Sequence, residues 1–106
     1  MTAVKHCGPC SGQTPKLSEA EIAESMVTLP NWEVKDGYVQ RAWRGKDFAE
    51  VIAKINQIAD LAENEGHHPD LHLTNYRHLL IQLRTHEIKG LSQNDFIMAH
   101  LIDEIL

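Results

Sequence analysis

Apolar residues recur along the chain at two different spacings, and each spacing predicts its own kind of element. Helical spacing predicts a helix from about Glu19 to Thr28, which Pro30 ends. The same spacing predicts a long amphipathic helix that ends at Gly66, with an apolar stripe formed by Phe48, Val51, Ile52, Ile55, Ala59 and Ala62. A third helix is predicted to begin at Ser92 and to run almost to the C-terminus.

Alternation of apolar and polar residues predicts four strands in two hairpins. The first hairpin joins residues 32–34 to 38–43 through the turn pair Asp36-Gly37. The second hairpin joins Leu71–Thr74 to Leu79–Thr85 across a turn at 75–77. Side chains of the last strand are expected to alternate between two faces, with Leu79, Ile81, Leu83 and Thr85 on one face and Leu80, Gln82, Arg84 and His86 on the other.

The order of these elements is helix, strand, strand, helix, strand, strand, helix, and it predicts an α+β fold. Because hairpins place strands antiparallel, we expect a four-stranded antiparallel sheet with three helices packed on one face. Residues 1–16 contain almost nothing apolar, so we interpret them as a flexible N-terminal tail. Residues 17–106 would then form a single domain.

Composition and charge exclude several classes of partner. The 106 residues carry 10 Lys and Arg against 15 Asp and Glu, a formal net charge of −5, which argues against nucleic-acid binding. No apolar run approaches the roughly 20 residues that cross a bilayer. The N-terminus also lacks the pattern of a signal peptide, so we expect a cytoplasmic protein without a membrane partner.

Histidine is the residue that points to chemistry. The chain has seven histidines, and five of them lie between residues 67 and 86, among them His67, His68, His72 and His86. His67 and His68 leave the long helix before Pro69, and His86 ends the predicted last strand. In an antiparallel hairpin, the start of the first strand lies beside the end of the second strand. The three imidazoles are therefore expected to converge. Imidazoles titrate near neutral pH, so one ring can act as an acid and another as a base.

The histidines allow two less specific interpretations. A single histidine at a helix end is ordinarily a solvated side chain or a partner of the helix dipole. His68 and His72 have the spacing of zinc ligands on a helix, but Pro69 ends the helix before that spacing can matter. We therefore predict no metal ligand among these histidines.

The segment Cys7-Gly8-Pro9-Cys10 has the spacing of a thioredoxin-like redox motif. No predicted strand precedes it, as that motif would require. With His6 it offers three metal ligands, one fewer than a closed tetrahedral site. We interpret it as two reduced thiols on a loose tail, with metal or redox behaviour as the open alternative.

Three motifs in the second half of the chain carry a more specific signal. They are Glu63-x-x-Gly66-His67-His68-Pro69, Thr85-His86-Glu87 and Gly90-Leu91-Ser92-x-x-Asp95-Phe96. In combination they resemble the pterin-4a-carbinolamine dehydratases (4a-hydroxytetrahydrobiopterin dehydratases), and the likeness covers about residues 17–106. The resemblance implies the α+β order described above and assembly as homodimers or homotetramers.

The resemblance also implies a hydro-lyase reaction and its residues. Water would be eliminated from 4a-hydroxytetrahydrobiopterin to give quinonoid dihydropterin, a step of tetrahydropterin cofactor recycling that needs neither a metal nor an organic cofactor. The implied catalytic residues are His67, His68 and His86. The implied substrate-binding residues are Glu63, Gly66, His67, His68, Arg84, Thr85, His86, Glu87 and Asp95.

Two other functional classes stay open at this point. The chain could be a non-catalytic dimeric binding or regulatory module of the same fold, or a metal-binding protein that uses its histidines and cysteines. Apolar residues cover more than one face of the last helix, which favours a homo-oligomer in either case.

Overall fold

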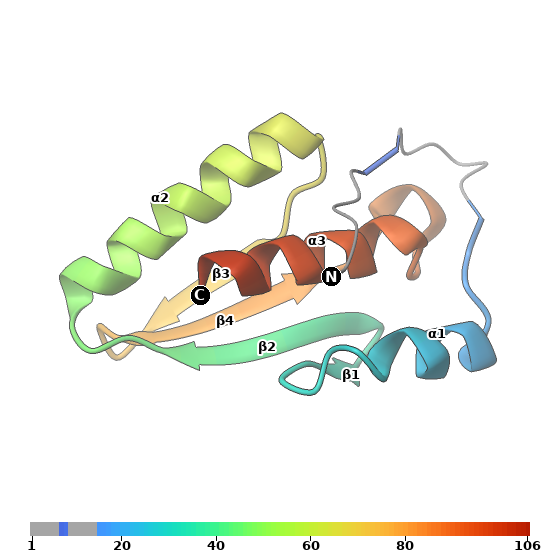
Figure 1. Cartoon of the computed structure of the whole chain (residues 1–106), viewed down its shortest axis with the longest axis horizontal. Helices are drawn as coiled ribbons and strands as arrows, with labels where there is room; N and C mark the ends of the chain where they lie inside the picture. The colour runs from blue at the N-terminus through green and yellow to red at the C-terminus, as the bar shows by residue number, and fades with distance from the viewer. Residues whose placement is uncertain (1–6, 9–14) are drawn as a thin grey trace.

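The computed structural model describes residues 7–8 and 15–106 and arranges them as one sheet with helices on one face (Figure 1). The helices in this part of the chain are α1 (Glu19–Met26), α2 (Phe48–Glu65) and α3 (Gln93–Ile105). The strands are β1 (Glu33–Lys35), β2 (Tyr38–Arg44), β3 (Asp70–Thr74) and β4 (His78–Leu83), and the 3₁₀ helix η1 (His86–Ile88) follows β4. The fold class and the order of helices and strands are confirmed. Within these ranges, no helix has the length and apolar character that crossing a bilayer requires.

The four strands form one antiparallel sheet in the order β1-β2-β4-β3. Each predicted hairpin supplies one half of the sheet, and the pairing of β2 with β4 joins the halves. The first turn is tight because Asp36 and Gly37 both have positive φ, 53° and 83°. This geometry matches the twist of the strands and pairs Lys35 directly with Tyr38.

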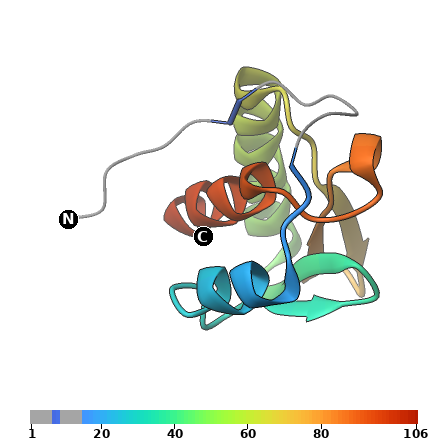
Figure 2. The same cartoon turned by 90° about the vertical axis from the view of Figure 1, so that its right-hand side faces the viewer.

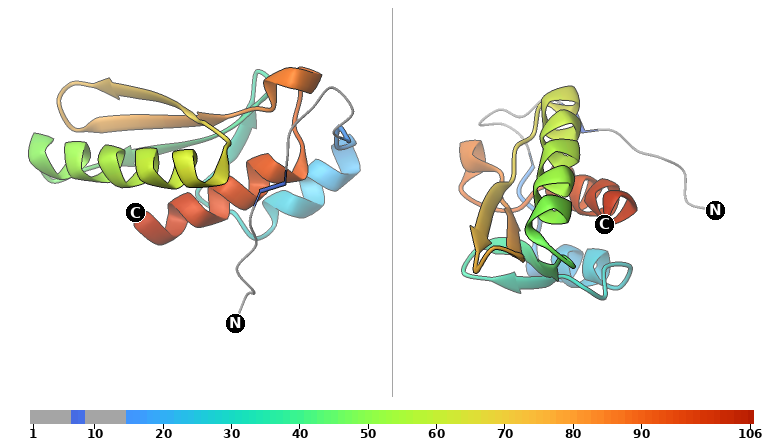
Figure 3. Two further views of the ribbon diagram at one scale, coloured as in Figure 1. Left: turned by 90° about the horizontal axis from the view of Figure 1, so that it is seen from above. Right: turned by 90° about the vertical axis from the view of Figure 1, so that its left-hand side faces the viewer.

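The core lies between the sheet and the helices, which gather on one side of it (Figure 3). Because side chains alternate along a strand, every second residue of the two central strands points toward the helices. Helix α2 and helix α3 each pack one face against these residues. The core side chains with no exposed surface at all are Val39, Val51, Ile58, Ile81, Leu83, Met98, Ala99 and Ile102.

A chain of polar side chains crosses the opposite face of the sheet. His72 Nε2 on β3 lies 2.8 Å from Gln82 Oε1 on β4. The Gln82 amide donates to Gln40 Oε1 on β2 at 2.9 Å, and the Gln40 amide donates to Glu33 on β1 at 3.1 Å. Since a carboxylate only accepts, Glu33 sets the orientation of both amides, and His72 carries its proton on Nε2.

The last strand ends earlier than the sequence predicts. The prediction extended it to Thr85 and placed His86 at its end, but β4 ends at Leu83. The neighbouring strand β3 begins at Asp70, and Pro69 before it has no N–H to continue the ladder. Thr85 instead forms an isolated antiparallel bridge with Gly90, and His86 begins η1.

Both predicted capping boxes are present, at the starts of α1 and α3. In the first, Ser18 Oγ accepts from Glu21 N at 3.2 Å, and Glu21 Oε1 accepts from Ser18 N at 3.0 Å. The hydrogen bond from the Ser18 backbone is the main reason that the pKa of Glu21 is lowered. The carboxylate form of Glu21 is therefore favoured in the folded chain.

This capping box predicts a pH-dependent part of stability. The pKa of Glu21 is lowered from its ordinary value of 4.5. The contribution of its carboxylate to the free energy of unfolding is therefore complete above pH 4.5 and is lost as the pH falls through the folded-state pKa. Urea unfolding should show a difference between wild type and Glu21→Gln at neutral pH that shrinks as the pH falls below 4.5. Glu24→Gln, at an exposed site on the same helix, is the control. A difference for Glu21→Gln that stays constant into acid would contradict this role.

Candidate functional site

The candidate site is centred on His67, which follows α2 after one residue. Gly66 closes the helix in the left-handed conformation, with φ 68°, and donates its N–H to Ala62 O at 2.9 Å. The predicted helix end is thus confirmed. After this turn His67 is only 6% exposed, whereas His68, the next residue, is exposed.

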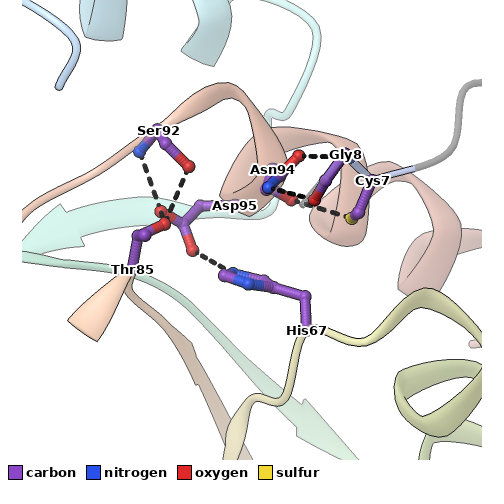
Figure 4. Close-up of polar contacts among 7 residues, drawn as sticks. All are labelled: Cys7, Gly8, His67, Thr85, Ser92, Asn94 and Asp95. Carbon is purple, nitrogen blue, oxygen red and sulfur yellow. Dashed lines mark hydrogen bonds and ion pairs between the residues drawn. The ribbon is translucent and has the colours of Figure 1, made fainter. Parts of the chain in front are cut away.

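Asp95 is the partner of His67 and has no exposed surface. Its Oδ1 lies 2.6 Å from His67 Nε2. Its Oδ2 accepts from Thr85 Oγ1 at 2.8 Å and from Ser92 N at 2.9 Å (Figure 4). One carboxylate therefore joins the exit of α2, the loop after β4 and the first turn of α3.

The hydrogen-bond partners determine where the protons lie in this cluster. Because the Asp95 carboxylate only accepts hydrogen bonds, the Thr85 hydroxyl donates its hydrogen bond to Asp95. Thr85 Oγ1 then accepts from the Ser92 hydroxyl, which lies 2.7 Å away. By the same reasoning His67 carries a proton on Nε2, so in the neutral ring Nδ1 is the nitrogen that accepts a proton.

A second histidine–carboxylate pair lies next to the first at the surface. His68 Nε2 is 2.5 Å from Glu63 Oε2. The side chains are 60% and 77% exposed, in contrast to the buried pair of His67 and Asp95. Two adjacent histidines are therefore each oriented by a carboxylate, one inside the protein and one in contact with water.

The other predicted site residues lie around Thr85. His86 and Glu87 are exposed on η1. Arg84 lies with Tyr38 on the sheet face away from the helices, and its guanidinium carbon is 5.7 Å from the centre of the Tyr38 ring. The buried Nε of Arg84 has no hydrogen-bond partner among the described residues. Such a donor is costly to leave unpaired, and an acceptor on a ligand would satisfy it.

The N-terminal segment also contacts this region, which the sequence did not reveal. Cys7 N donates to Glu65 Oε1 at 2.7 Å, and Cys7 Sγ lies 3.6 Å from Asn94 O. Gly8 N donates to Asn94 Oδ1 at 3.0 Å, and Asn94 Nδ2 donates to Gly8 O at 2.9 Å. Figure 2 shows the short blue segment of these two residues beside the start of α3 and the end of α2. No local pattern links residues so distant in the chain.

Within residues 7–8 and 15–106, no three histidine, cysteine, aspartate or glutamate side chains are grouped so that they could hold a metal ion. His6 and Cys10, which the sequence placed with Cys7 as possible ligands, lie outside the described residues.

Comparisons with known proteins agree on one family. Residues 15–105 match the family model described as pterin 4 alpha carbinolamine dehydratase. A relative from Methylococcus capsulatus, named as a pterin-4-alpha-carbinolamine dehydratase, is 38% identical over 103 residues, which cover 95% of this chain and 90% of the relative. A crystal structure from Brucella melitensis, titled transcriptional coactivator/pterin dehydratase, has a TM-score of 0.80 and 29% sequence identity. It covers 86% of this chain and 98% of its own.

The geometry of the buried cluster predicts the effect of Thr85→Val on stability. The substitution preserves the side-chain volume but removes the O–H that donates to Asp95, and this should lower the free energy of unfolding by about 1–3 kcal/mol. Urea unfolding measures the change. Thr74→Val, at an exposed position on β3, is the matched control and should stay within about 0.5 kcal/mol of wild type. Equal values for the two variants would contradict the hydrogen bond.

Proposed function

Since the chain belongs to the pterin 4 alpha carbinolamine dehydratase family, and so to the hydro-lyases, we propose that it acts by histidine acid/base catalysis. The proposed reaction is the dehydration of 4a-hydroxytetrahydrobiopterin to quinonoid dihydropterin, in tetrahydropterin cofactor recycling. The observation that carries the mechanism is the buried pair of His67 and Asp95, with 2.6 Å between Nε2 and Oδ1. A histidine held this way is suited to proton transfer.

The reaction requires one base and one acid. A ring nitrogen loses a proton as a C=N bond forms, the C4a–O bond breaks, and the departing hydroxyl takes up a proton to leave as water. No electrons are gained or lost overall, so the residues need only move protons and hold the pterin. Paired proton transfer of this kind is a common task of histidines.

His67 is the proposed base. When its ring takes a proton on Nδ1, the positive charge that forms faces the Asp95 carboxylate across the Nε2 hydrogen bond. Thr85 and Ser92 keep that carboxylate in place. Asp95 therefore acts through His67, and its complete burial supports this positioning role over direct contact with the substrate.

His86 is the proposed acid. It lies exposed on η1, so it can regain its proton from water after each turnover. His68, oriented by Glu63, is proposed to bind the 4a-hydroxyl group. The remaining contacts to the pterin are assigned to Gly66, Arg84 and Glu87, with the unpaired Nε of Arg84 as a donor to a substrate acceptor. Thr85, which also has no exposed surface, acts with Asp95 as a positioning residue.

We also propose that the protein works in the cytoplasm as a homodimer or a homotetramer. Val27 and Phe48, two large apolar side chains at the surface of this chain, are 79% and 52% exposed. Association of copies would cover such surface. Light scattering should give two or four times 12.0 kDa, and a mass of 12.0 kDa at micromolar concentration would contradict assembly.

Removing the acid should be visible directly in kcat. His86→Ala and His67→Ala should each lower kcat by about 10²–10⁴, the usual contribution of a general acid or base. The measurement is stopped-flow dehydration of 4a-hydroxytetrahydropterin, with the uncatalysed rate subtracted. His78→Ala, which removes an exposed histidine from β4, should keep the wild-type rate. Full turnover by His86→Ala would remove it from the mechanism.

A further inference from the structure

The contacts of Cys7 and Gly8 lie immediately beside the two residues of the buried pair. Glu65, which accepts from Cys7 N, is the last residue of α2 and stands two positions before His67. Asn94, which binds Gly8, directly precedes Asp95. Cys7 and Gly8 therefore connect the segment that carries His67 to the segment that carries Asp95.

Both ends of the Asn94 side-chain amide take part in this connection. Asn94 is 7% exposed, its carbonyl oxygen accepts from Gly8 N, and its amide donates to Gly8 O. A side-chain amide that accepts with its oxygen and donates with its nitrogen is held in one orientation. Figure 4 shows this contact beside the Asp95 cluster, with Asn94 and Asp95 on the same first turn of α3.

The chain is tethered again near the same turn. Leu17 N donates to Leu91 O at 2.9 Å, just before the cap of α3. The family match begins at Pro15, so Cys7 and Gly8 lie outside the part of the chain that the family describes. Their contacts with α2 and α3 therefore extend beyond the region of the family model, to the place where the buried pair is assembled.

We propose that Cys7 and Gly8 form a clip that fastens the end of α2 to the start of α3, and that Asn94 is a positioning residue for His67 and Asp95. The clip limits relative movement of the two chain segments, so the distance between His67 Nε2 and Asp95 Oδ1 is maintained during turnover. The proposal rests on the acid/base function proposed above for His67. It assigns to the N-terminal segment a role in the rate of the chemical step.

Two substitutions in the full-length protein open the clip from opposite sides. Asn94→Ala removes both amide contacts, and Gly8→Pro removes the N–H that donates to Asn94 Oδ1. Gly8→Ala is the matched control, because a Cβ at this position meets nothing within 4 Å and the N–H is retained. Gln93→Ala, at an exposed position of the same turn, controls for changes to α3.

Asn94→Ala, which removes two hydrogen bonds, should lower kcat roughly tenfold, and Gly8→Pro, which removes one, should lower it by about three- to fivefold. KM should change less than about twofold in both variants. The double variant should be no slower than the slower single variant, because the two substitutions break one contact. The ¹⁵N signals of the His67 ring should shift in both variants and stay in place in both controls. A merely structural role would lower the unfolding midpoint without moving kcat or these signals.

Wild-type kcat in Asn94→Ala and Gly8→Pro, or strictly additive losses in the double variant, would overturn the clip. If Asn94→Ala fails to fold, Gly8→Pro decides, since Gly8 is exposed and lies outside the core. If the wild-type protein itself dehydrates no pterin, the proposed function fails. The clip is then judged by the His67 signals alone, and unchanged signals in the opening variants would reject it.

Discussion

The burial of one carboxylate controls the arrangement of the whole site. A charged group without contact to water is costly unless donors surround it, so Asp95 can be buried only where donors converge. The three donors come from His67, Thr85 and Ser92, on segments that the sheet and helices bring together. Removing any one donor leaves part of the charge uncompensated. The contacts that make the buried charge tolerable consequently also fix the orientation of the histidine ring and place an N–H at Nε2.

This requirement also explains the irregular end of β4. If the strand continued as the sequence pattern suggests, Thr85 would pair in the ladder and His86 would follow on the sheet. Instead the ladder stops at Leu83, and the bridge from Thr85 to Gly90 turns the chain toward α3. The turn brings the Thr85 hydroxyl to Asp95 and leaves His86 on η1. Pro69, which offers no N–H, makes the early end possible.

Local patterns predicted most of the fold because each depends on neighbours in the chain. The helical stripes, both capping boxes and the helix end at Gly66 need only a few consecutive residues. The clustering of histidines near the helix exit also singled out His67, whereas Asp95 was placed in the site only through resemblance to a family. That His67 turns inward while His68 turns outward depends on the left-handed turn and on the core beyond it, which no short window contains. The contacts of Cys7 with residues 58 and 87 positions away could not be predicted for the same reason.

The polar row on the uncovered sheet face has a consequence of a different kind. Its direction is dictated from one end, because Glu33 at the edge strand can receive protons but cannot supply them in its ionised state. A lysine at position 33 would donate instead, so the side-chain amides of Gln40 and Gln82 would each turn over. Nε2 of His72, which now donates, would then have to accept a hydrogen bond. A change of charge on β1 would in this way change the protonated ring nitrogen of a histidine on β3, at the opposite edge of the sheet, without any change in the backbone.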